Sequence, residues 1–137
     1  MIAIGIDPGV NTGFALWDTE KRILTEVTSV SILAAIRLCE QMHRFGSLHS
    51  VTFEDARMRT WFGSKGAEAL QGAGSIKRDC SIWAEFLGEL GAPYKSISPH
   101  GKGRKLTAPE FARLTGWKAR TNNHGRDAAM LVFGMKG

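Results

Sequence analysis

The sequence has no apolar run near the roughly 18 residues that suggest a membrane-spanning helix. It also has no basic segment leading into an apolar stretch with a cleavage site, so we expect no secretory leader. Cysteine is scarce, because Cys39 and Cys80 are the two in 137 residues, and both lie among apolar residues in helical patterns. This favours buried reduced thiols and argues against a disulfide or a cysteine-ligated zinc site. We therefore expect a cytoplasmic protein with no membrane association.

The sequence has fewer acidic than basic residues. The 13 Asp and Glu and the 18 Lys and Arg give a net charge of +5 and a pI near 9.6. A basic domain of this size favours polyanionic partners, of which nucleic acid is the commonest. On charge alone, a merely basic soluble protein remains the alternative. No internal repeat, low-complexity segment or linker interrupts the chain, so we expect residues 1–137 to form one domain.

Short segments rich in β-branched and aromatic residues, bounded by turn residues, predict five strands, at 2–7, 13–18, 23–30, 51–54 and 94–98. Apolar spacings of three and four, with capping residues, predict four helices, at 31–46, 67–90, 107–114 and 123–133. This order predicts an α/β fold with a mixed five-stranded sheet flanked by helices. The first three strands should be antiparallel, and the later strands should run parallel to the first.

Two carboxylates stand at the ends of predicted strands. Asp7 ends the first strand in "IGIDPGVNTG", and Glu54 ends the fourth. Functional groups of open α/β sheets collect at the carboxyl ends of the parallel strands, so neighbouring strands would bring both residues to one rim. The two charges would repel there unless a cation lies between them, and oxygen ligands favour Mg²⁺ or Mn²⁺.

The last predicted helix adds His124 and Asp127, which share a face because they are three residues apart. Together with Asp7 and Glu54 they describe a site for two metal ions and phosphodiester hydrolysis. Each residue has an ordinary alternative. Asp7 could cap the turn after it, Glu54 could be a solvated strand end, Asp127 could favour the helix dipole, and His124 could be a surface histidine.

Three stretches, "IGIDPGVNTGFALWD", "VTFEDAR" and "HGRDAAMLV", resemble in order and spacing the RuvC-like Holliday-junction resolvases of the ribonuclease H-like superfamily. The Asp-Pro-Gly that begins at Asp7 matches the family's first motif, and Glu54 matches its second acid. The C-terminal motif is a pair of acids three apart. Asp127 matches the second acid, while His124 replaces the first, as in some ribonuclease H-like nucleases.

The resemblance implies a homodimeric endonuclease that depends on Mg²⁺ or Mn²⁺, two ions per site, and cleaves four-way junctions or related branched DNA. The helix at 67–90 would form much of the dimer interface. The compact chain suggests a phage-type member, acting in the cytoplasm of a bacterial cell or of a phage-infected host.

Basic and aromatic residues alternate in the loop after Glu54, where cations can hold phosphates and aromatic rings can stack on unpaired bases. A second basic group follows the fifth predicted strand, and one lysine lies on the long helix. The candidate DNA-binding residues are Arg57, Arg59, Trp61, Phe62, Lys65, Lys77, Lys102, Arg104 and Lys105. Trp61 or Phe62 is the candidate for a wedge that opens the junction.

Two other readings of the same residues remain open. "DPGVNTG" also resembles the phosphate-binding loop of actin-like and sugar-kinase-like ATPases, but that fold needs two such domains, and we expect no nucleotide cofactor. The metal chemistry equally suits an RNA-processing relative, or a nuclease that acts on RNA–DNA hybrids.

Overall fold

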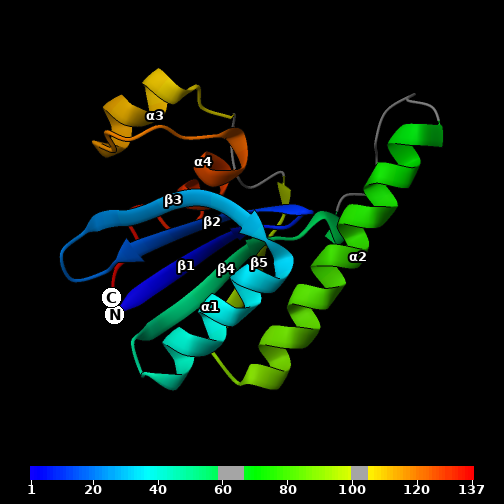
Figure 1. The fold of residues 1–137 in the computed structure, drawn as a ribbon, viewed down its shortest axis with the longest axis horizontal. Helices are drawn as coiled ribbons and strands as arrows, with labels where there is room; N and C mark the ends of the chain where they lie inside the picture. Colours follow the sequence, from blue (N-terminus) through cyan, green and yellow to red (C-terminus); the bar gives the residue numbers. More distant parts are fainter. Residues whose placement is uncertain (59–66, 100–104) are drawn as a thin grey trace.

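The computed structural model describes residues 1–58, 67–99 and 105–137, with the backbone alone at residues 58 and 67–73. Five strands form one sheet (Figure 1). The first three are β1 (Ile2–Asp7), β2 (Asn11–Asp18) and β3 (Ile23–Ser31), and the other two are β4 (Leu48–Glu54) and β5 (Tyr94–Ile97).

The sheet has the order β3-β2-β1-β4-β5. The pairs β1/β2 and β2/β3 are antiparallel, whereas β4 lies parallel to β1 and β5 parallel to β4. This mixed arrangement is the one that the element order predicts. Because β4 is the direct neighbour of β1, the strands that carry Asp7 and Glu54 end at the same edge.

Helices cover both faces of the sheet (Figure 1). On one face, α1 (Ile32–Arg44) and α2 (Ala67–Leu90) enclose a core that includes Ile4, Phe53 and Trp83. The short 3-10 helix η1 (Ala56–Met58) lies beside α2. On the other face, α3 (Ala108–Thr115) and α4 (Asn123–Met130) contribute to a second core. Alternation along β1 explains the two cores, because successive residues of a strand point to opposite faces.

The helix α4 lies unusually close to the sheet, and glycines make this possible. A Cβ atom added at Gly5 would lie 2.1 Å from the Ala128 carbonyl oxygen, and one at Gly13 would lie 2.0 Å from that of His124. No side chain larger than hydrogen fits at either position without moving α4. The two glycines therefore set how near the N-terminal end of α4 comes to the end of β1.

Several predicted boundaries were wrong. The strand β2 begins at Asn11 rather than at 13, because Asn11 pairs with Ser31 of β3. The strand β4 begins at Leu48 rather than at 51, because Leu48 pairs with Ile2. The last helix ends at Met130 rather than at 133, and the chain then turns through Gly134 at φ +83°. Within the described residues, no helix has the length and apolarity needed to cross a membrane.

Candidate metal centre and nucleic-acid interface

The parallel pairing of β1 and β4 brings Asp7 and Glu54 to one rim of the sheet. Ile6 is aligned with Phe53 in the register of the two strands, and each carboxylate follows as the next residue and the last of its strand. The turn after Asp7 is closed by Thr12, whose buried hydroxyl donates to the Gly9 carbonyl over 2.8 Å. The chain thus leaves the rim immediately after Asp7, and the carboxylate stays at the end of β1.

The N-terminal end of α4 carries His124, which lies beside Asp7. The Asn122 side chain caps the helix by accepting a hydrogen bond from the Gly125 amide over 2.7 Å. The His124 ring nitrogen Nδ1 then lies 3.2 Å from Oδ2 of Asp7. Because a carboxylate accepts hydrogen bonds, Nδ1 donates in this pair. The Asp7 side chain is 16% exposed and the His124 side chain 52% exposed, so the histidine covers the acid from the solvent side.

Asp127, one turn further along α4, has a different partner. Its carboxylate Oδ2 lies 3.5 Å from the Lys105 ammonium, and its side chain is 9% exposed. Lys105 is 74% exposed, so its ammonium reaches Asp127 from the solvent side of the rim. A carboxylate this buried needs a counter-charge, and Lys105 supplies one.

The four predicted ligands do not form a ready-made metal cage. Among residues 1–58, 67–99 and 105–137, no three His, Cys, Asp or Glu side chains lie close enough together to hold one ion. Carboxylates close to one another repel. Here Asp7 contacts His124, and Asp127 forms an ion pair with Lys105. The donor set nevertheless fits Mg²⁺ or Mn²⁺, because it offers three carboxylates and one imidazole on adjacent elements.

Arg126, a buried arginine that the sequence reasoning missed, joins α4 to the residues on either side of α3. Arg126 is 9% exposed, and its guanidinium donates to the Leu106 carbonyl (3.1 Å), to the Thr121 hydroxyl (2.8 Å) and carbonyl (3.2 Å), and to the Asn123 side-chain oxygen. All of these acceptors are uncharged. The arginine joins α4 to the segment that carries Lys105. Its signal in the sequence is a charged residue inside an otherwise buried helix.

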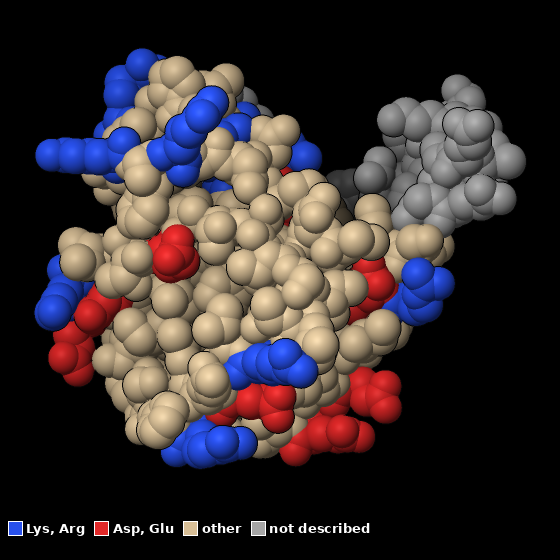
Figure 2. Space-filling model, in the orientation of Figure 1, with Lys and Arg blue, Asp and Glu red and all other residues tan. Residues whose placement is uncertain are grey.

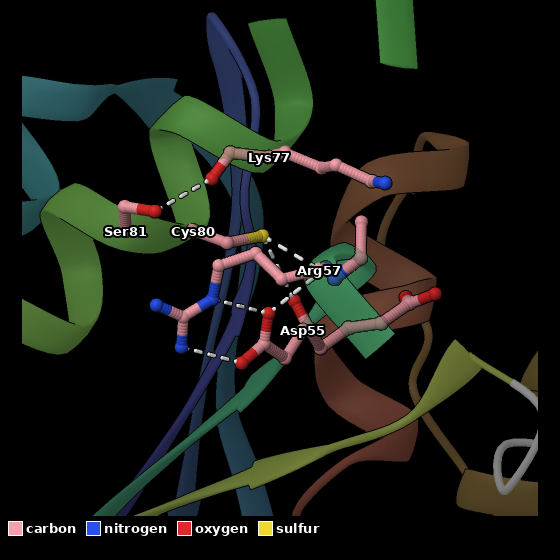
Figure 3. A network of polar contacts seen from close by, with 7 residues as sticks. Asp55, Arg57, Lys77, Cys80 and Ser81 are labelled. Atoms are coloured by element: carbon pink, nitrogen blue, oxygen red, sulfur yellow. Dashed lines mark hydrogen bonds and ion pairs between the residues drawn. The ribbon is translucent and has the colours of Figure 1, made fainter. Parts of the chain in front are cut away.

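A second network fixes the chain directly after Glu54 (Figure 3). Asp55 is 2% exposed and accepts hydrogen bonds from Nε (2.9 Å), Nη2 (2.7 Å) and the amide (3.0 Å) of Arg57. The Arg57 side chain lowers the pKa of the Asp55 carboxyl below its ordinary value. Arg57, a candidate DNA-binding residue, thus uses its amide, Nε and Nη2 as donors to Asp55 within the protein. An Asp two residues before an Arg, directly after a strand, is the local pattern of this turn.

Cys80 of α2 completes the second network. Its sulfur lies 3.4 Å from the Ala56 amide and 3.5 Å from the Glu54 carbonyl oxygen, so α2 contacts the end of β4. Lys77, one turn earlier, extends its ammonium away from the Asp55–Arg57 pair (Figure 3). The remaining candidate DNA-binding residues lie outside the described part of the chain, namely Arg59, Trp61, Phe62, Lys65, Lys102 and Arg104.

The sheet order and the flanking helices are those of a ribonuclease H-like fold. No protein-family model matches the chain, and no curated protein matches its sequence. Among solved structures, the chain is similar to RuvC of T. thermophilus in complex with a Holliday junction substrate. The TM-score is 0.60 and the identity 20%, over 97% of this chain and 90% of that one. The predicted RuvC-like fold is therefore confirmed.

Proposed function

We propose that this protein is a metal-dependent endonuclease that cleaves four-way junctions or related branched DNA. The observation that supports the proposal is that, on a RuvC-like fold, Asp7 and Glu54 end neighbouring parallel strands and His124 of α4 contacts Asp7. Asp127, three residues further along α4, belongs to the site as part of the proposal. Oxygen-rich sites of this kind suit Mg²⁺ or Mn²⁺, with two ions per site as the expected number. The solved relative with this fold holds a Holliday junction.

Each rim residue has a role that follows from its surroundings. Asp7 ends the strand beside the one that carries Glu54 and contacts His124 of α4, so we assign it to both ions. Glu54 and Asp127 would each complete one ion. His124, which already donates to Asp7, would act as a ligand or hold the attacking water. When bound, the metal supplies an activated water and stabilises the leaving oxygen.

Substrate binding would come from cations that surround the rim. Lys105 lies at the rim, and Lys77 lies on α2 near the end of β4. Arg57 can add a phosphate contact through the part of its guanidinium that Asp55 leaves exposed, since its side chain is 39% exposed. Arg59, Trp61, Phe62, Lys65, Lys102 and Arg104 belong to the proposal on sequence alone.

A homodimer would place two such rims on one junction, and α2 is the proposed interface. Its described part buries Trp83 against the sheet while leaving Ile76 42% and Ile82 39% exposed. Two exposed isoleucines on one helix suit contact with a second copy. Light scattering tests this directly: we expect twice the 15.0 kDa of one chain, and a monomer at all concentrations would contradict it.

The test of function is a panel of labelled substrates: four-way junction, flap, linear duplex and RNA–DNA hybrid, each with Mg²⁺, Mn²⁺ or EDTA. We expect paired nicks in the four-way junction with either metal and none with EDTA. Preferential cleavage of the hybrid would instead favour a ribonuclease acting on the same rim. Cleavage that persists in EDTA would contradict the metal-dependent mechanism.

A further inference from the structure

The segment from Lys105 to Asn122, which contains α3 and is here called the α3 segment, concentrates positive charge. It holds four basic residues and one acidic residue. Arg113, Lys118 and Arg120 are exposed and, within the described chain, none of them forms an ion pair. In Figure 2, Lys and Arg side chains gather over α3, at the upper left, while Asp and Glu lie lower on the molecule. Among the described residues, these three cations therefore have no acidic partner.

The one acid of the α3 segment is occupied at the start of the helix. The Glu110 carboxylate accepts hydrogen bonds from the amide (3.1 Å) and the hydroxyl (3.0 Å) of Thr107, while the Glu110 amide donates back to that hydroxyl. This capping box holds the negative charge at the helix N-terminus, where the helix dipole favours it. The basic residues lie beyond it, at Arg113 and after the left-handed turn at Gly116.

The α3 segment is fixed firmly to the body of the protein. Phe111 is 1% exposed and packs in the core beneath α4, with Trp117 beside it. The buried Arg126 holds the two ends of the segment through the Leu106 and Thr121 carbonyls. Cations on a framework of this kind keep their spacing when they bind, which lowers the entropy cost of recognition.

Both ends of the α3 segment adjoin the candidate metal centre. It begins at Lys105, paired with Asp127, and it ends at Asn122, which caps the helix that carries His124. The segment that carries these cations is therefore anchored at both ends to α4, the helix that carries His124 and Asp127. The aromatic residues of the segment, Phe111 and Trp117, pack in the core rather than offering rings to unpaired bases. Cations without such rings suit the phosphates of a double helix rather than single strands.

We infer that Arg113, Lys118 and Arg120 form a second DNA-binding surface, which holds the phosphate backbone of a duplex arm next to the cleaved strand. The inference rests on the proposed function for its substrate, and it adds a surface beyond the rim. Phosphate contacts of this kind act independently of sequence and contribute a salt-dependent part of the affinity.

The test compares two triple variants in an Asp7→Asn background, so that binding is measured without cleavage. One variant carries Arg113→Ala, Lys118→Ala and Arg120→Ala. The control carries Lys21→Ala, Arg37→Ala and Arg44→Ala, which removes the same charge from exposed positions outside the α3 segment. Fluorescence anisotropy in Mg²⁺ gives the Kd over a range of salt concentrations. The ligands are a long-armed junction, a junction with arms cut to one helical turn of about 10 base pairs, and a linear duplex.

For the long-armed junction and the linear duplex, we expect the slope of log K against log salt to become less negative by about 2–3 in the α3 variant, because each lost phosphate contact removes about 0.9 from its magnitude. Its affinity for both should fall at least about tenfold, while the short-armed junction and the control variant change little. Equal losses in both variants, or no loss in either, would overturn the inference. The linear duplex keeps the outcomes separable, since it reports on this surface even if the protein cleaves no junction.

Discussion

Replacing Gly13 with alanine tests whether close contact between α4 and the sheet brings His124 to Asp7. The new methyl group would lie 2.0 Å from the His124 carbonyl oxygen and 2.8 Å from Asp7 Cβ. Because ordinary contacts begin near 3.4 Å, the first atom must retreat by about 1.4 Å. Such a shift is large enough to break the 3.2 Å contact between His124 and Asp7. Since overpacking against backbone is poorly relieved, we expect the free energy of unfolding to fall by about 2–3 kcal/mol.

Urea denaturation measures the stability change, and junction cleavage at low temperature, where the variant stays folded, measures the effect on the rim. Gly74→Ala is the matched control, because a Cβ there meets nothing within 4 Å. Gly74 lies inside α2, so alanine there should stabilise the protein by up to about 1 kcal/mol, in contrast to the loss expected at Gly13. A Gly13→Ala protein with native stability and native cleavage would refute the proposed role of this close approach.

Three further predictions concern buried groups of the protein. Asp55→Asn should lower the unfolding free energy at pH 7 by about 1–3 kcal/mol. Because the folded pKa of Asp55 is lowered, its contribution is full above the ordinary value of 3.8 and is lost as pH falls through the folded pKa. The difference between the two proteins in urea melts should therefore shrink as the pH is lowered below 3.8, and a difference that grows would contradict this account. Burial raises the pKa of Cys39 to about 12 and that of Cys80 to about 11. At pH 8 we therefore expect both thiols to react with a thiol reagent at least about 100-fold more slowly in the folded protein than in the unfolded one. Equal rates would contradict their burial. Arg126→Met should lower the free energy of unfolding in urea melts by about 2–4 kcal/mol, because several buried acceptors lose their donor. Arg126→Lys should recover part of this loss. Wild-type stability in Arg126→Met would show that the network is dispensable.

The sheet was largely predictable because each strand carries its own local signal. The run before Asp7 is apolar and ends in Pro-Gly, and turn residues separate the next two strands. The strand starts were not predictable in the same way. Asn11 and Leu48 join their strands through partners 20 and 46 residues away, Ser31 and Ile2, and local composition does not report such pairing.

At the rim, the sequence indicated candidate acids but not what they contact. The adjacency of β1 and β4 agrees with the expected sheet, whereas the contact between Asp7 and His124 was not predicted. The contacts of Lys105 and Arg126 depend on how the α3 segment folds back over α4, which no periodicity records. The short distance between the α4 backbone and the sheet was also not predicted. In the sequence, Gly5 and Gly13 look like ordinary strand glycines, and only the structure shows that the α4 backbone lies against them.

Asp7→Asn gives the most direct test of the central claim that the rim is a metal-dependent nuclease site. The substitution removes a metal ligand and a negative charge while nearly preserving the size of the side chain. With a labelled four-way junction in Mg²⁺ or Mn²⁺, we predict that cleavage is abolished, while the Kd for the junction is unchanged or lower. Full cleavage by Asp7→Asn would contradict the account.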